Sequence, residues 1–324
     1  MDKKSQKISR RAALTRTGLL AGAALALSPR QTAAAPSGVS SGKQGNFIFS
    51  LNTATIRGQK LGIVKEAEIA AKAGYQAIEP WIDSISDYKK SGGSLPDLKK
   101  RIADLGLVVP SSIGFAQWIV EDDERRAKGL EQARRDMELV AAIGGQRLAC
   151  PPSGGTDKPG MSILKAAERY RALVDAGEQI GVLAQLELWG FSKNFHRLGE
   201  CVAIAIESGH PKACVLLDVF HLYTGGTEIN GIGLLNGNTV HTLHMNDYPA
   251  DPPREKINDS FRCFPGDGTA PIVEILRKLR AIGGEKALSL ELFSQKYWTM
   301  DPFEVATTGL EKMKAVVEKA LAGA

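Results

Sequence analysis

The chain has 324 residues, of which 43% are hydrophobic and 24% charged, and its formal net charge is +5. Residues 1–35 hold seven basic residues and one acidic residue, a net charge of +6, so the rest of the chain carries about −1. This balance excludes the basic surface expected of a nucleic-acid-binding protein, and no apolar stretch after residue 35 is long enough to cross a membrane.

The first 35 residues are predicted to be a twin-arginine-type export signal. Arg10 and Arg11 precede a short apolar run at 18–27, and alanines at 33–35 form a small-residue cleavage zone. The apolar run is shorter than the roughly 20 residues of a membrane-spanning helix, which disfavours an anchor, whereas an ordinary secretory signal stays open. We therefore expect a periplasmic or otherwise exported protein, with the twin-arginine export machinery as a partner.

Residues 36–45 are rich in Ser and Gly and predict a linker, and residues 46–324 predict a single catalytic domain. Its predicted strands are 47–52, 75–81, 107–112, 147–151, 183–188, 213–218, 239–245 and 287–293. Its predicted helices are 61–73, 96–105, 122–143, 161–180, 197–208, 270–282 and 302–322. Strands that alternate with helices favour an α/β fold of the (β/α)8 TIM-barrel type. A doubly wound open sheet is less favoured, because no glycine-rich phosphate loop follows the first strand.

Polar residues end the last four predicted strands: Glu187, Asp218, His244 and Glu291. The strands of a parallel barrel are covered on both faces, so a charged side chain within them needs a partner or a metal. Glu187, His244 and Glu291 alternate with helix-facing leucines or methionine, which directs them toward the barrel interior. Active sites of barrel enzymes lie at this C-terminal end of the strands.

Three carboxylates in a small apolar cavity would repel one another unless a cation lay among them. Together with one imidazole they form a mixed oxygen and nitrogen set that suits Mn²⁺, Co²⁺, Zn²⁺ or Mg²⁺. We therefore predict that Glu187, Asp218, His244 and Glu291 bind a divalent metal ion. Each residue taken alone could instead form an ordinary salt bridge or a helix cap.

The motifs "GYQAIEPW", "LELW", "LLDVFH", "HMND", "PGDG" and "LSLELF" occur in this order along the chain. In their order and strand placement they resemble the xylose isomerase-like TIM barrel superfamily of sugar isomerases and epimerases. The resemblance implies that Glu187 and Glu291 are also the acid/base pair and that His221 contacts the substrate. Epimerases of this kind carry an arginine six residues after the metal histidine, where this chain has Ala250.

The predicted function is that of a divalent-metal-dependent sugar isomerase or epimerase, acting on a keto-sugar or cyclitol through an enediolate. The alternative is a metal-dependent lyase or hydratase of a keto-sugar, such as a 3-keto-glycoside. An abasic-site endonuclease is disfavoured, because no histidine precedes His196. A non-catalytic sugar-binding protein is disfavoured because Glu187 and Glu291 are both present.

Further residues are candidates for the pocket wall. Substrate contacts are predicted for Glu79, Trp81, Trp189, Arg254 and Arg262, the two arginines being candidates to replace the one missing at position 250. Glu79 could equally form a structural ion pair, and the two tryptophans could equally be packing residues. Asp247, next to His244, is expected either to orient the metal site or to cap a loop. The expected partner is a small-molecule sugar, and the sequence leaves the oligomeric state open, a homo-oligomer included.

Overall fold

The structure is a computed structural model that describes residues 46–322, so the predicted export signal (1–35) and linker (36–45) lie outside the described residues. Its strands are β1 (Phe47–Asn52), β2 (Ala77–Glu79), β3 (Ser112–Ile113), β4 (Arg147–Cys150), β5 (Leu183–Glu187), β6 (Val215–Asp218), β7 (Val240–Met245) and β8 (Lys286–Leu290). They pair in parallel in the order β2-β1-β8-β7-β6-β5-β4-β3.

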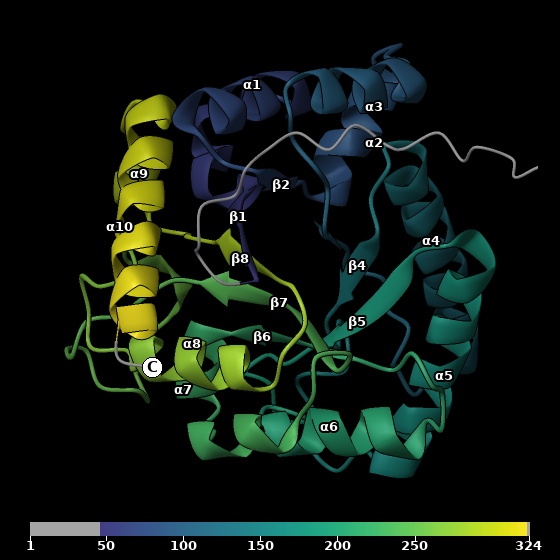
Figure 1. Ribbon diagram of the computed structural model, residues 1–324. Coiled ribbons are helices and arrows are strands. Elements are labelled where there is room, and N and C mark those ends of the chain that lie inside the picture. Colours follow the sequence, from purple (N-terminus) through teal and green to yellow (C-terminus); the bar gives the residue numbers. More distant parts are fainter. Residues whose placement is uncertain (1–45, 323–324) are drawn as a thin grey trace, which may run out of the picture. The chain divides into compact units, whose positions relative to one another are not determined.

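The two ends of this sheet meet and nearly close it into a barrel. Single parallel bridges join Ala77 to Val108 and Trp81 to Ile113. The Ile113 N–H also donates a hydrogen bond to the Pro80 carbonyl at 3.2 Å. The predicted TIM barrel is therefore confirmed, with the strands at the centre and the helices around them (Figure 1).

The helices follow the strands along the chain. They are α1 (Ile63–Ala73), α2 (Ile82–Lys90), α3 (Leu95–Asp104), α4 (Asp123–Ala142), α5 (Ile163–Ile180), α6 (Leu198–Glu207), α7 (Val219–Thr224), α8 (Ile272–Ala281), α9 (Gln295–Trp298) and α10 (Pro302–Ala322). Short 3₁₀ helices are η1 (Thr53–Gln59), η2 (Ile229–Leu234) and η3 (Asp259–Phe261). Leucines on the outer faces of the strands, such as Leu186, Leu217 and Leu243, are fully buried against the helices.

One strand and three helices differ from the predictions. The third strand is predicted at 107–112 but is confined to Ser112–Ile113, because Pro110 has no N–H to donate to a strand ladder. The helices α2, α7 and α9 were not predicted. All three are short, and α2 buries only Ile85, too little apolar surface for a periodic pattern.

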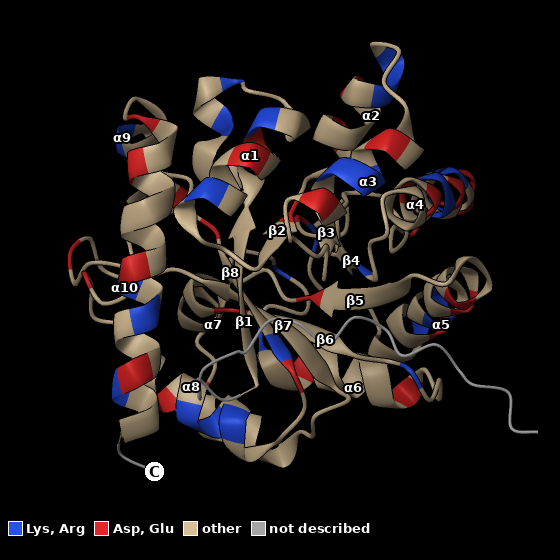
Figure 2. Ribbon diagram, turned by 45° about the horizontal axis from the view of Figure 1, so that its top comes forward, with Lys and Arg blue, Asp and Glu red and all other residues tan. Residues whose placement is uncertain are grey.

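Charged residues lie mostly on the outer helices, where both signs are mixed, as on α5 and α10 (Figure 2). This mixing agrees with the near-neutral charge of the chain beyond residue 35. Within residues 46–322, no helix has the length and apolar content that crossing a bilayer would require.

Candidate metal centre and active site

The strand register brings the predicted polar residues to one edge of the barrel. Asp218 of β6 lies opposite His244 of β7, and His244 lies opposite Ser289 of β8. Strand β8 ends at Leu290, and the next residue, Glu291, continues the pairing by donating its N–H to the Met245 carbonyl at 3.1 Å. The four side chains therefore start from neighbouring positions at the C-terminal ends of their strands.

Glu187, Asp218, His244 and Glu291 form one buried cluster. Each offers a ligand atom, and these four atoms lie within 4.8 Å of one another. His244 Nδ1 lies 3.2 Å from Glu291 Oε2, 3.4 Å from Glu187 Oε1 and 3.6 Å from Asp218 Oδ2. Although it faces three carboxylate oxygens, Nδ1 makes no hydrogen bond. Three oxygens around an unpartnered imidazole nitrogen fit a divalent metal ion, which these four residues would hold.

Glu79 lies behind His244 as a buried ion-pair partner and does not line the cavity, which matches the second of the two alternatives predicted for it. Its Oε2 atom is 3.1 Å from His244 Nε2, and both side chains are fully buried. Burial opposes protonation of His244, but the carboxylates of Glu291 and Glu79 raise its pKa well above the ordinary value. Asn52 Nδ2 donates to both Glu79 Oε2 (3.0 Å) and Glu291 Oε1 (3.1 Å). Glu79 thus orients the imidazole so that Nδ1 points at the cluster.

Of the two candidate arginines, only Arg262 reaches the cluster. Its Nη1 atom lies 2.7 Å from Asp218 Oδ2 and 3.0 Å from Glu291 Oε2, and its side chain is 1% exposed. Its Nε–H donates to Asp259 Oδ1 at 2.9 Å. Burial opposes ionisation of Asp218, but Arg262 outweighs it and holds the pKa of that carboxyl well below its ordinary value. The Arg254 side chain is 48% exposed and does not line the pocket.

His221 lies beside the cluster because α7 begins directly after β6. Asp218 caps that helix, accepting the His221 N–H at Oδ1 over 2.9 Å. His221 Nε2 is 3.3 Å from Arg262 Nη2, and since a guanidinium only donates, Nε2 must accept and the ring proton belongs on Nδ1. Burial, together with the charge of Arg262, lowers the pKa of His221 despite the nearby Asp218. Nδ1 has no hydrogen-bond partner and is free to donate to a ligand.

A cavity of about 240 Å³ opens above the cluster. It is lined by Trp81, Ile113, Phe115, Glu187, Trp189, Phe191, His221, Asp259, Arg262, Glu291 and Phe293. Glu187 and Glu291 reach this cavity, whereas Asp218 and His244 are fully enclosed. Burial, reinforced by the neighbouring carboxylates, raises the pKa of Glu187 above its ordinary value even though His244 opposes the shift.

Two polar residues near the site, Asn52 and Asp259, were not singled out from the sequence as site residues, and neither were the cavity-lining residues Phe115, Phe191 and Phe293. Asn52 donates hydrogen bonds to Glu79 and Glu291. It ends β1, so the strand-end pattern that revealed the cluster could also have revealed Asn52. Asp259, which holds Arg262, follows an irregular loop with no periodic signal.

Asp247 caps a loop and does not contact the metal cluster. Its carboxylate accepts the N–H groups of Tyr248, Gly266, Gly268 and Ala270, at 2.8 to 3.0 Å. Gly266 has φ +89°, and a Cβ atom on Gly268 would lie 2.3 Å from Asp247 Oδ1. The "PGDG" motif therefore needs its glycines in order to wrap around this carboxylate.

Residues 67–316 match the sequence profile of the xylose isomerase-like TIM barrel family. This chain belongs to that family. It is similar to an inosose isomerase of Bacillus velezensis, with 25% identity over 260 residues that cover 79% of this chain and 92% of the relative. It is also similar to a 3-dehydroshikimate dehydratase of Pseudomonas aeruginosa, with 24% identity over 256 residues, 79% of this chain. The match spans only 40% of the length of that dehydratase.

Solved structures of the family have the same fold. The IOLI protein with a bound zinc atom superposes with a TM-score of 0.78 at 22% identity, over 84% of this chain and 99% of that chain. D-psicose 3-epimerase, solved with D-fructose, gives a TM-score of 0.64 at 19% identity, over 85% and 97% of the two chains. Family members similar to this chain are thus isomerases, epimerases and dehydratases.

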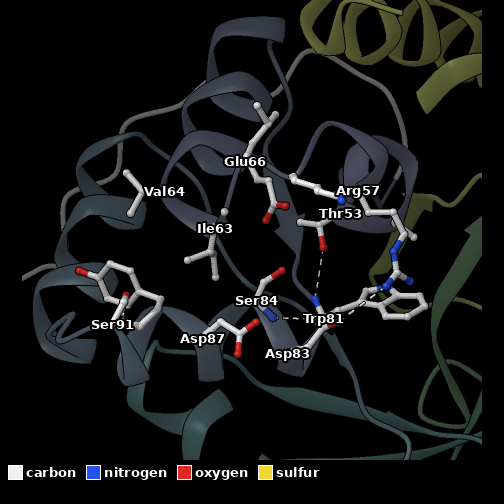
Figure 3. Close-up of a pocket in the computed structure, with 15 residues that line it drawn as sticks. Thr53, Arg57, Ile63, Val64, Glu66, Trp81, Asp83, Ser84, Asp87 and Ser91 are labelled. Carbon is white, nitrogen blue, oxygen red and sulfur yellow. Dashed lines mark hydrogen bonds and ion pairs between the residues drawn. The ribbon is translucent and has the colours of Figure 1, made fainter. Parts of the chain in front are cut away.

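A larger cavity of about 500 Å³ lies beside the site, between η1, α1 and α2 (Figure 3). It shares Trp81 with the active-site cavity but contains none of the four cluster residues. Glu66 of α1 lines it, is 3% exposed, and has an Oε2 atom without a hydrogen-bond partner. Burial, reinforced by Asp83 and opposed by Arg57, raises the pKa of Glu66 to about 7.

Replacing Glu66 with Gln is expected to stabilise the protein at alkaline pH. The folded state favours protonated Glu66, so its stabilising contribution is complete below about pH 4.5 and is lost as the pH rises through about 7. Above that pH the free energy of unfolding of the variant should exceed that of wild type by up to about 3 kcal/mol. Near pH 4 the two proteins should have the same free energy of unfolding. Urea titrations across this pH range measure the difference. Glu68→Gln, on the exposed face of the same helix, is the control, and an equal gain in that variant would contradict the assignment.

Proposed function

We propose that this protein is a divalent-metal-dependent isomerase or epimerase of a keto-sugar or keto-cyclitol, with Glu187 and Glu291 as its acid/base pair. The proposal is carried by a difference among the four cluster residues in their access to the cavity. All four residues converge on one point, but only the two glutamates also reach the cavity. These two carboxylates can therefore contact both an ion and a substrate. The ion would be Mn²⁺, Co²⁺, Zn²⁺ or Mg²⁺.

A bound ion would polarise the substrate carbonyl and acidify the adjacent C–H bond. One glutamate removes that proton, and the other returns a proton to the opposite face of the same carbon or to the neighbouring carbon. His221 donates its Nδ1–H to the oxygen on which charge develops, and Arg262 adds a fixed positive charge beside it.

Elimination is the second candidate. It begins with the same proton removal and ends when a hydroxyl group on the next carbon leaves as water. The similarity to a 3-dehydroshikimate dehydratase supports elimination as the second candidate reaction. From residues 1–35, we propose in addition that the protein acts after export.

Proton exchange in D₂O tests the proposal. The metal-loaded protein is incubated with inosose, L-ribulose, D-fructose and 3-dehydroshikimate, with each of the four metals in turn. We expect deuterium at the carbon next to the carbonyl of at least one compound, detected by NMR and mass spectrometry. New ketose isomers then indicate isomerisation or epimerisation, whereas an absorbing unsaturated product indicates dehydration. No exchange with any compound and any metal would contradict the proposed function.

A further inference from the structure

Five aromatic residues form a rim around the active-site cavity: Trp81, Phe115, Trp189, Phe191 and Phe293. Their ring centroids follow one another at 5.9 Å (Phe293 to Trp81), 4.8 Å (Trp81 to Phe115), 6.2 Å (Phe115 to Trp189) and 5.1 Å (Trp189 to Phe191). They come from the segments after β2, β3, β5 and β8. Segments far apart in sequence thus build one continuous aromatic rim.

Part of this rim is held rigidly from behind. The indole N–H of Trp81 donates to Asn52 Oδ1 at 3.0 Å, and the Arg57 guanidinium lies 4.2 Å from the ring centroid. Figure 3 shows Arg57 next to the indole of Trp81. Trp81 is therefore a fixed wall, and its position does not depend on a ligand.

Two members of the rim are left open to solvent. Phe115 is 42% exposed and Phe191 is 58% exposed. Exposing the apolar surface of two neighbouring phenyl rings to water is unfavourable, and a ligand that covers both rings would remove that cost.

Polar and apolar groups are separated by depth in this cavity. Glu187, Glu291, His221 and Arg262 are at most 3% exposed and form its base, whereas its most exposed lining side chains are the phenyl rings of Phe115 and Phe191. Asp259, 38% exposed, also lines the cavity, and its carboxylate is paired with Arg262. A volume of about 240 Å³ is below the roughly 300–1,000 Å³ of pockets that enclose drug-sized ligands. A ligand larger than one polar ring must therefore extend onto Phe115 and Phe191.

We propose that the substrate is a polyhydroxylated ring that carries an aromatic group, such as an aryl glycoside, and that Phe115 and Phe191 bind the aromatic group. The polar ring occupies the base of the cavity, next to Glu187 and Glu291. This inference rests on the proposed function for the polar ring, but the aromatic subsite is defined by binding alone. A free monosaccharide has no aromatic group and would leave this subsite empty.

Binding of matched glycosides tests this subsite without turnover. Phenyl and methyl β-D-glucopyranoside, and their 3-keto forms, are titrated into metal-loaded protein, with calorimetry as the readout. We expect the phenyl compound of a pair to bind about tenfold more tightly, because stacking on two aromatic rings contributes on that order. In Phe191→Ala and Phe115→Ala the preference should fall toward onefold, while the affinity for the methyl compound stays unchanged.

Leu234→Ala is the matched control, since Leu234 is 90% exposed and does not line the cavity, and it should keep the wild-type preference. Equal affinities of wild type for the two compounds of each pair, or no binding of either, would overturn the proposal. So would sedimentation that shows a wild-type dimer dissociating in Phe191→Ala, because the rim would then be a subunit interface. If the phenyl preference holds but no sugar exchanges deuterium, the proposed reaction fails and the aromatic subsite stands.

Discussion

Glu291→Gln is expected to lower the rate of deuterium exchange by about 10²- to 10⁴-fold at saturating metal, the range for loss of a general acid or base. Gln keeps the oxygen that accepts from Asn52 and has nearly the same volume, so the fold should be retained. What it loses is the ability to take up a proton and the charge that faces His244 and Arg262. The exchange rate is measured by NMR with the substrate identified in the D₂O screen.

Glu255→Gln is the matched control, because that side chain is 73% exposed and lies outside the cavity. It should exchange at the wild-type rate. Wild-type exchange in Glu291→Gln, with the metal bound, would contradict a proton-transfer role for Glu291.

Arg262→Ala is expected to lower the free energy of unfolding of the metal-free protein by about 3–5 kcal/mol, the usual cost of leaving a buried charge without its partner. Arg262 contacts Asp218 and Glu291, and its guanidinium carbon lies 4.9 Å from the ring centroids of both Phe220 and Phe293. Its removal therefore eliminates a buried cation between two carboxylates and two aromatic rings.

A divalent ion should reverse part of this loss, because its charge would compensate the same carboxylates. Denaturant titrations of wild type and variant, each with chelator and with metal, measure the four free energies. Arg262→Lys keeps the charge but loses the separate guanidinium donors that contact Asp259 and the cluster, so its free energy of unfolding should fall between those of wild type and Arg262→Ala. A loss in Arg262→Ala that is identical with and without metal would contradict the link between Arg262 and the cluster.

The barrel was predictable because its strands and helices have different periodicities and because glycines mark the helix ends. The convergence of Glu187, Asp218, His244 and Glu291 could also be predicted from the sequence, since alternation along a strand decides which face a residue occupies. Strand boundaries were less accurate. Pro110 confines the third strand to two residues. Around it, the chain forms only single bridges, from Val108 to Ala77 and from Ile113 to Trp81.

The remaining parts of the site depend on contacts that no local pattern encodes. Arg262 and Arg254 are both arginines in the irregular segment between β7 and α8, and only the folded loop determines which one enters the cluster. Glu79 ends β2 just as the cluster residues end their strands, yet packing places it behind His244. Because strand-end position alone does not separate a metal ligand from the group that orients it, the sequence left Glu79 open between the pocket wall and a structural ion pair.

Metal content measured on purified protein tests the central claim most directly. Wild type and His244→Ala, each incubated with Zn²⁺ or Mn²⁺ and passed through a desalting column, are analysed by elemental mass spectrometry. If the four residues hold the ion, wild type should retain about one ion per chain and His244→Ala much less. His210 precedes the N-terminal end of β6 and lies next to Glu178, so His210→Ala should retain as much metal as wild type. Equal metal content in wild type and His244→Ala, or no retained metal in either, would contradict the account.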